Sequence, residues 1–547
     1  MAGIVIIGGG VTGLSAGIHL LADSGQAHRV TVCERHTVPG GNLTGWVRGG
    51  CYIDNCVHWL VGTNPATTLY REWVKLGALD GAEIRHPDSL YTCRLDGEKI
   101  ALWRDAVRVE RAMLWYSPAD GREIRRLFRA VRALQSLSGL TGGAGLLRRT
   151  AAGLPELAVY ARLTTGELAQ RFRHPLLRQF LTAVCDTSFS ALAQLAVMAQ
   201  FCAGNADLPA GGSAAMAERM AARFRSLGGV LRLGTEAESI DLSGTGGIRR
   251  ACGVTMRQGT RVVHILADYV IVTADPATVC GRILDAPLPA ALARRYAAQP
   301  PQRFSAVQAA FACPSARVGF SGELILPFPA GEDACPHASS VLLREFSHEP
   351  GFAPQGYTVV QAMAFCGEQE ARRILSLSRP AYAALKQDIA RTFAGILEAV
   401  CPPVGGEEKL RLLDVWTPAT YRRFVGTETG SFMSFPMLPG DGFRNGVAEL
   451  AERILPQERG AVIPRDYGTE PEEVCPGGCP VALRALSRVL KMSCWQVSGC
   501  AHRAGCLLPP GRGAVRRARR SGFCCGQGGY RFVLPVRRRR EADKKRG

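Results

Sequence analysis

Three glycines near the N-terminus stand at a spacing that suits the binding of a phosphate group. Gly8, Gly10 and Gly13 form the pattern G-x-G-x-x-G. The first glycine permits a tight turn, the second lets the backbone approach a pyrophosphate, and the third lets a helix pack on a strand. Such a helix points its unpaired N–H groups and the positive end of its dipole at the phosphates. Glu34 follows about 20 residues later, where a carboxylate accepts ribose hydroxyls.

The elements that must position these residues are also visible in the sequence. The apolar run 4–7 is typical of a parallel strand that is buried on both faces. A helical pattern follows, with Leu14, Ile18 and Leu21 on one side, and 30–33 forms a second strand. Glycine-rich turns alone are common, but strand, glycines, helix and strand together predict a dinucleotide-binding βαβ unit. The alternative for Glu34 is an ordinary solvated loop acid.

A second glycine turn follows the second strand. Glu34 and Arg35 lead into Pro39-Gly40-Gly41. Here the chain resembles the flavoprotein group that includes phytoene desaturases, carotenoid isomerases, retinol saturases and amine oxidases. The resemblance implies FAD as the cofactor, held by Gly8, Gly10, Gly13, Glu34, Arg35, Gly40 and Gly41.

Residues 48–65 resemble the phytoene desaturase-like branch of this group. In that branch an aspartate and a following histidine enter the flavin region, and Asp54 and His58 stand at the matching positions. A direct role for His58 is one interpretation. The other is that His58 is a structural residue with satisfied hydrogen bonds.

The resemblance also implies a discontinuous, Rossmann-like FAD domain of the α/β class, with an α+β substrate domain interleaved. Its second piece would consist of a helix from about Gly212 to Gly228, strands at 230–233 and 236–242, a hairpin that turns at Gln258-Gly259, and a buried strand within 268–276 that ends in a turn. Ala237 matches a residue whose backbone touches the adenine region in the family, which usually has valine there. The predicted units are 1–75 and 206–290 for FAD, 76–205 and 291–433 for substrate, and 434–547 for an irregular tail.

The region 105–205 has helical periodicity. Ile124, Leu127, Phe128, Val131 and Leu134 form an apolar stripe, and arginines cover the opposite face. One interpretation is the lip of a substrate tunnel that leans on anionic lipid. The other is an ordinary amphipathic helix with a solvated basic face.

Farther along, 356–361 reads as a strand, about 381–397 as a long helix, and 414–433 resembles the family's return toward the flavin. The body shows no Ser-His-Asp order, Walker loop or zinc-spaced set of ligands, so we expect no metal and assign the chemistry to the flavin.

Charge and cysteines are concentrated at the end of the chain. Residues 511–547 carry 13 Lys and Arg against two acidic residues, which accounts for +11 of the net charge of +19. Because the body is only mildly basic, we expect no nucleic-acid partner. The remaining cysteines are scattered singly, as in reduced cytosolic proteins.

Met1-Ala2-Gly3 leaves no room for a signal peptide before the first strand, so we expect a cytoplasmic protein that at most rests on a membrane surface.

The tail departs from the family, which closes the FAD site with a strand, a glycine-rich turn and a last helix. Two interpretations are a disordered basic tail and a zinc module built from Cys475, Cys479, Cys500, His502 or Cys506. In a third, the reading frame slips between Ser434 and Leu486. With suitable codons, residues 486–508 read from the third base can give LPGLKNVLLAGVWLRTPGGLPA, which resembles the missing motif. The excess charge and cysteines would then be artefacts of the wrong frame.

The resemblance implies desaturation, saturation or isomerisation of a long apolar polyene, with hydride passing between a substrate carbon and the flavin. Amine oxidation is a second interpretation and predicts an aromatic cage beside the flavin. A third is a prenyl-binding escort protein, because Rab-escort-like proteins share this fold without redox chemistry.

Overall fold

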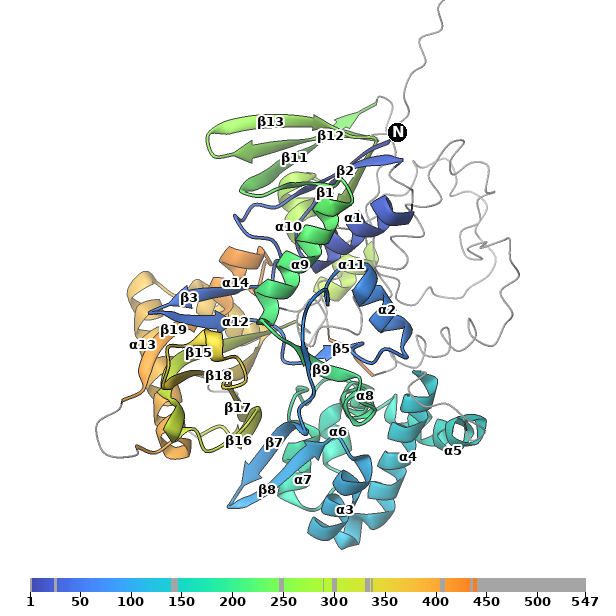
Figure 1. Ribbon diagram of the computed structural model, residues 1–547, viewed down its shortest axis with the longest axis vertical. Coiled ribbons are helices and arrows are strands. Elements are labelled where there is room, and N and C mark those ends of the chain that lie inside the picture. Colours follow the sequence, from blue (N-terminus) through green and yellow to red (C-terminus); the bar gives the residue numbers. More distant parts are fainter. Residues whose placement is uncertain are drawn as a thin grey trace, which may run out of the picture.

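The computed structural model describes most of the chain up to residue 439. The described residues are 2–23, 27–138, 146–244, 250–288, 290–297, 303–329, 335, 338–403, 409–432 and 436–439. The tail from residue 440 onward, with its zinc-module and frame-shift interpretations, lies outside them. Within the described part, helices and several sheets form an α/β protein, as the sequence predicts (Figure 1).

A four-stranded parallel sheet is assembled from two distant pieces of the chain. Its strand order is β10-β2-β1-β14, with β1 at Ala2–Ile7, β2 at His28–Cys33, β10 at Val230–Arg232 and β14 at Tyr269–Val272. Two strands come from the N-terminus and two lie some 200 residues later. This sheet, here called the cofactor sheet because the resemblance places FAD beside it, is therefore discontinuous, as predicted.

Both faces of this sheet are buried, which explains the unbroken apolar run in β1. Ile4 and Ile6 pack with α1 (Val11–Asp23), α2 (Thr68–Lys75) and α9 (Gly212–Ser226). Val5 and Ile7 face the opposite way, into a core shared with a three-stranded sheet. Alternate side chains of one strand thus serve two cores, as expected of a central parallel strand.

The three-stranded sheet is antiparallel and includes the predicted hairpin. It consists of β11 (Thr235–Ser243), β12 (Arg250–Gln258) and β13 (Arg261–Leu266). The turn after Gln258 uses Gly259 at φ 59°, a backbone conformation that favours glycine. Figure 1 shows this sheet at the end of the molecule farthest from α3.

A seven-stranded sheet forms the other large layer, in the order β19-β15-β18-β17-β16-β7-β8. Its strands are β7 (Ser89–Leu95), β8 (Glu98–Trp103), β15 (Phe304–Pro314), β16 (Glu323–Pro327), β17 (Ser340–Glu345), β18 (Tyr357–Gly367) and β19 (Arg411–Trp416). The predicted long helix is α13 (Arg379–Val400), which covers one face of the sheet through Ile389 and Phe393. The other face, here called the inner face, packs on the helical region and on the N-terminal loops.

The helical region lies between the two pieces of the cofactor sheet. It contains α3 (Ala106–Tyr116), α4 (Gly121–Leu137), α5 (Leu146–Tyr160), α6 (Thr165–Ala169), α7 (Pro175–Leu181) and α8 (Ala191–Cys202). The predicted apolar stripe on α4 is confirmed, because Ile124, Leu127, Phe128 and Val131 are fully buried.

Shorter elements join the layers: β3 (Gly45–Arg48), β4 (Cys51–Asp54), β5 (Leu60–Val61), β6 (Ile84–Arg85), β9 (Ala206–Pro209), α10 (Pro276–Thr278), α11 (Ala290–Tyr296), α12 (Glu368–Ser376) and α14 (Pro418–Val425). The domain boundaries stay a prediction.

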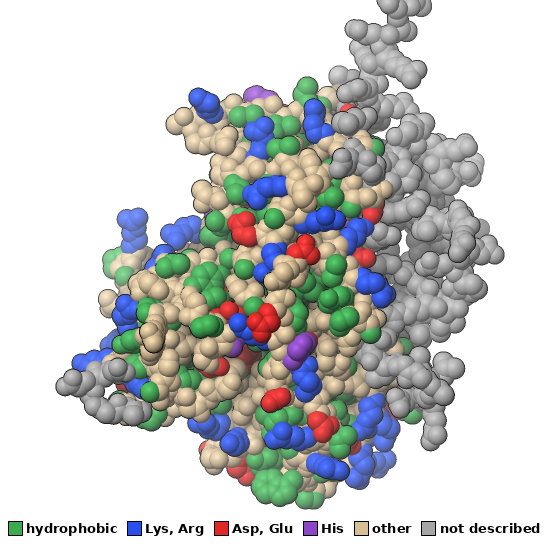
Figure 2. Space-filling view, in the orientation of Figure 1, with side chains coloured by type: hydrophobic (Ala, Val, Ile, Leu, Met, Phe, Trp, Pro, Cys, Tyr) green, Lys and Arg blue, Asp and Glu red, His purple; other side chains and the backbone are tan. Residues whose placement is uncertain are grey.

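The basic face of α4 is partly neutralised within the protein. Arg129 pairs with Glu156 of α5 at 2.6 Å, and Arg132 pairs with Glu110 of α3. Figure 2 shows Lys and Arg side chains spread over the visible face, with acidic side chains between them. This pairing favours an ordinary amphipathic helix over a lipid-binding lip.

Among the described residues, no helix combines the length and the apolar character needed to span a membrane.

Candidate cofactor site

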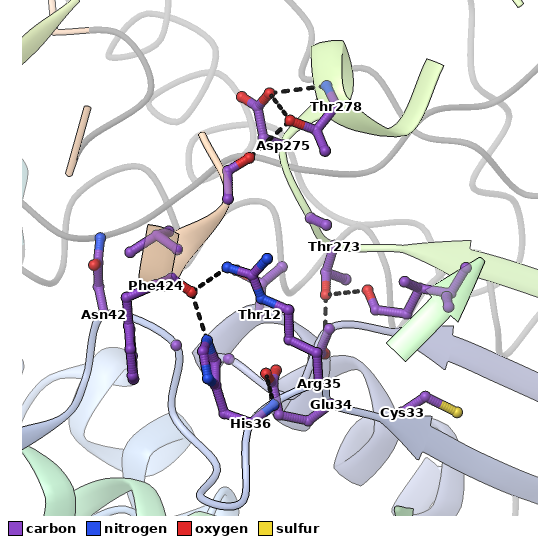
Figure 3. A pocket seen from close by; sticks show the side chains of 18 of the residues that line it. Thr12, Cys33, Glu34, Arg35, His36, Asn42, Thr273, Asp275, Thr278 and Phe424 are labelled. Carbon is purple, nitrogen blue, oxygen red and sulfur yellow. Dashed lines mark hydrogen bonds between the residues drawn. The ribbon is translucent and has the colours of Figure 1, made fainter. Parts of the chain in front are cut away.

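A pocket lies at the carboxyl ends of β1, β2 and β14, where parallel α/β sheets bind their ligands. Three parts of the chain line it. The N-terminal part supplies residues in 7–43 and Cys56, the second piece of the sheet supplies residues in 235–237 and 273–283, and the last part supplies residues 424–426. Figure 3 shows the side chains of Glu34, Arg35, His36, Thr273, Asp275 and Phe424 gathered around it.

The two glycine turns meet directly at the pocket. Gly40 N donates to Gly9 O at 2.8 Å, and Gly10 pairs with Gly40 in a parallel bridge. Gly40 has φ +117°, and a Cβ built on it would stand 2.2 Å from Leu43 O, so no other residue fits there. Gly8, Gly10, Gly40 and Gly41 all line the pocket, which gives it a floor of bare backbone.

Gly13 lies behind the pocket and does not line it. A Cβ on Gly13 would stand 1.9 Å from Gly8 O. This glycine therefore lets the first turn of α1 press against the end of β1. The role in helix–strand packing is the one that the third position of the fingerprint implies.

Glu34 is held in place and still has free acceptor capacity. Its Oε2 accepts from Gly9 N at 2.8 Å and its Oε1 accepts from His36 N at 2.9 Å. Each carboxylate oxygen can accept more than one hydrogen bond. Glu34 lines the pocket together with Val11 and Thr12 of the first turn of α1. These residues fit a dinucleotide, because the helix turn can face its pyrophosphate and Glu34 can accept its ribose hydroxyls.

The far wall of the pocket comes from the second piece of the cofactor sheet. Ala237 of β11 lines it and is 7% exposed. Asp275 caps the short helix α10 by accepting from Thr278 N at 3.0 Å, and it also accepts from Tyr296 Oη at 2.9 Å. Burial, and then the charge of Asp275, raise the pKa of Tyr296 far above its usual range. The phenol therefore remains a donor that fixes this wall.

The end of α14 closes one side of the pocket, within the segment 414–433 for which the resemblance predicts a return toward the flavin. Arg35 donates to Arg423 O at 2.8 Å and also to Phe424 O. The ring of His36 stacks on Phe424 with centroids 4.0 Å apart, and its Nε2 is 2.6 Å from Phe424 O. Basic groups suit this place because the last carbonyls of a helix lack partners and carry its negative pole. Figure 3 shows both contacts converging on Phe424.

Asp54 and His58 lie close to the pocket, but neither lines it. Asp54 is 1% exposed and accepts from both N and Oγ of Ser213 at 2.6 Å, which ties β4 to the start of α9. Of this loop, Cys56 reaches the pocket. His58 turns instead to the seven-stranded sheet, where its Nδ1 is 2.5 Å from Glu323 Oε1.

The sequence therefore missed several residues of the site. His36 follows Arg35 directly and could have been included on that ground, and Asp275 lies in the turn that was predicted to end the strand from 268. Phe424 and Glu323 had no local signal, because each meets the N-terminal segment only through tertiary packing.

A parallel cofactor sheet in two pieces, with a glycine floor and a ribose-binding carboxylate, defines a dinucleotide-binding α/β protein. The chain belongs to the family of flavin-containing amine oxidoreductases, whose model matches residues 11–458. FAD is accordingly its cofactor, and the glycine floor and Glu34 fit that group.

Individual proteins give more distant similarities. The chain is 29% identical over 311 residues to a phytoene dehydrogenase from Streptomyces griseus, a match that spans 52% of this chain and 57% of that protein. The chain thus covers little more than half the length of this relative. A crystal structure of an oxidoreductase from Methanosarcina mazei is 16% identical with a TM-score of 0.49, covering 76% of this chain and 87% of that one. Putrescine oxidase bound to putrescine is also 16% identical with a TM-score of 0.49, covering 82% and 90%. At these identities the solved structures say nothing of the substrate.

Proposed function

We propose that this flavoprotein acts on a long apolar polyene or isoprenoid, which it desaturates, saturates or isomerises. The observation that carries the proposal is the similarity to the phytoene dehydrogenase from Streptomyces griseus. It covers only part of both chains, so the substrate class is the point that most needs a test.

The pocket adjoins a packed apolar core, which is compatible with an apolar substrate but is not itself an open binding site. Trp59, Phe346 and Met363 belong to one buried apolar cluster between the inner face of the seven-stranded sheet and the helical region. That cluster borders the loop that carries Cys56 into the pocket. When bound, the flavin supplies the two-electron redox chemistry that the side chains lack.

The same region offers little support for amine oxidation. Tyr421 and Phe432 are an aromatic pair on the inner side, with centroids 5.7 Å apart. Both are buried, and the Tyr421 hydroxyl is engaged with Gln308 at 2.6 Å and with Trp416 at 3.2 Å. These rings are packed into the core and do not form an open cage.

The test is reduction of the bound flavin under anaerobic conditions. The purified full-length protein is mixed with phytoene in lipid vesicles, or with putrescine, and flavin absorbance is followed. Bleaching by phytoene and not by putrescine supports the proposal in the form of desaturation, because of the three reactions only desaturation passes electrons from the substrate to the flavin. Bleaching by putrescine alone refutes it in favour of amine oxidation. A protein that carries no flavin but binds a prenylated peptide refutes it in favour of an escort role.

A further inference from the structure

A buried charged cluster lies next to the cofactor pocket and is separate from it. His58 Nδ1 is 2.5 Å from Glu323 Oε1, and Arg344 Nε is 3.8 Å from the same oxygen. The side chains of Glu323 and Arg344 are 4% and 6% exposed, and that of His58 is 17% exposed. Glu323 and Arg344 are direct neighbours in the register of β16 and β17, whereas His58 comes from the loop between β4 and β5.

Burial of a carboxylate is costly unless its oxygens have partners. Glu323 Oε1 has the close contact with His58 and the longer one with Arg344, whereas Oε2 is inaccessible and has no hydrogen-bond partner among the described residues. A carboxylate placed only to pair with Arg344 would gain most from two short contacts with the guanidinium. The short contact instead goes to the imidazole.

The loop that carries His58 is fixed by the same sheet and by α14. Gln361 Nε2 donates to Asp54 O at 2.8 Å, and the Tyr421 hydroxyl donates to Asn55 Oδ1 at 3.1 Å. Gln361 stands opposite Arg344 in the register of β17 and β18. Gln361 of the sheet and Tyr421 of α14 therefore hold this loop, and Glu323 adds a contact to the histidine ring.

This contact determines which ring nitrogen carries the proton. With the Glu323 carboxylate as the acceptor, Nδ1 is the donor of this hydrogen bond, and the tautomer is inferred from the contact. In the neutral ring Nε2 then holds the lone pair, and no hydrogen bond joins it to a described residue. A histidine with one nitrogen on a carboxylate and the other open is the arrangement of a proton-exchanging group.

We propose that Glu323 is a positioning residue that fixes His58 as the Nδ1–H tautomer, so that Nε2 exchanges a proton with a ligand beside the cofactor pocket. The proton is the one that the substrate loses together with a hydride when it is desaturated. It passes to Nε2 and is later released to water, and the proton transfer itself changes no oxidation state. The Glu323 carboxylate stabilises the imidazolium formed in between. The role in turnover rests on the proposed function, whereas the tautomer does not.

The tautomer can be observed directly by NMR of the full-length protein with ¹⁵N-labelled histidine. The chain has ten histidines, and a His58→Asn variant identifies the signals of His58. The wild-type protein should show Nδ1–H. A charge-assisted hydrogen bond corresponds to roughly a tenfold or greater preference for the Nδ1–H tautomer. Glu323→Gln should reduce this preference, because its neutral amide can offer Nδ1 either an oxygen or an NH2 group. A wild-type ring protonated at Nε2, or an unchanged tautomer in folded Glu323→Gln, would overturn the proposal.

Glu345→Gln is the matched control. Glu345 is the next residue after Arg344, is 2% exposed, and accepts from Gly322 N at 2.9 Å and from Ser347 N at 2.6 Å. It is as buried as Glu323, but its hydrogen-bond partners among the described residues are backbone N–H groups, so its replacement should leave the His58 tautomer unchanged. A shift as large as that in Glu323→Gln would mean a general packing effect and would overturn the proposal.

The role in turnover is read from flavin bleaching by the apolar substrate. Glu323→Gln should slow bleaching about tenfold or more with flavin content unchanged, and Glu345→Gln should not. Normal bleaching in a variant that has lost the tautomer would overturn the role of Glu323 and leave the proposed function standing. A wild-type protein without flavin would overturn the proposed function and leave the tautomer result valid.

Discussion

Replacing Gly13 by alanine should destabilise the protein, although alanine is the better helix former. A Cβ at this position would stand 1.9 Å from Gly8 O and 3.0 Å from Thr273 Oγ1. Since Cβ atoms do not approach backbone oxygens within about 3 Å, the first turn of α1 must move from β1 by roughly 1 Å. Overpacking of this kind costs about 1–3 kcal/mol, more than the gain of up to about 1 kcal/mol in helix propensity. The moved turn also lines the pocket, so flavin content should fall.

Gly395→Ala is the comparison that isolates this effect. Gly395 lies on the exposed side of α13, and a Cβ there would meet nothing within 4 Å. This variant should be stabilised by about 0.5–1 kcal/mol with flavin content unchanged. Calorimetry and flavin absorbance of the two purified variants give the comparison. If Gly13→Ala were stabilised as much as Gly395→Ala and kept its flavin, the reasoning from close helix–strand packing would be refuted.

Three further predictions concern the rest of the molecule. Asp54→Ala leaves the buried N–H and hydroxyl of Ser213 without their acceptor and should cost about 2–5 kcal/mol in thermal unfolding; a variant as stable as the parent would contradict this. Burial, and then the charge of Arg344, lower the pKa of His348 to about 4. As the pH falls from 6.5 to 4, the unfolded chain therefore binds this proton before the folded chain does. The free energy of unfolding should fall by about 2–3 kcal/mol over this range, and a His348→Gln variant should not show that loss. Sequencing the coding DNA tests the frame shift over 434–486, and an undisturbed frame with unrelated codons would end that hypothesis. If the frame is shifted, restoring it should raise the flavin occupancy of the purified protein.

The N-terminal half of the site was predictable because its signals are local. An apolar run, three glycines at fixed spacing and a carboxylate after the next strand lie within about 30 residues. The strands at 230–232 and 269–272 were also visible as short apolar runs, although their places beside β2 and β1 came from the family resemblance.

The remaining contacts of the site were not predictable from local pattern. Glu323 and His58 are 265 positions apart, and Phe424 lies 388 positions after His36. Each pair meets only because the seven-stranded sheet packs against the N-terminal loops. Neither Glu323 nor Phe424 differs from an ordinary strand or helix residue in the sequence, since a buried carboxylate is recognised only once its surroundings are known.

The return of the chain to the pocket links the described fold to the tail. α14 starts at a Thr417 cap and ends at Gly426, whose φ of 84° and bond from Thr278 Oγ1 at 2.7 Å fix its end beside the pocket. From there the chain runs to Phe432, whose carbonyl accepts from the pocket residue Asn42 at 2.7 Å. It thus reaches the edge of the cofactor site just before the stretch over which the frame shift is predicted. A slip there would leave the sheets and their cores encoded as described, and would change only residues that follow the chain's arrival at the cofactor. Flavin retention is therefore the property that such a slip should alter most.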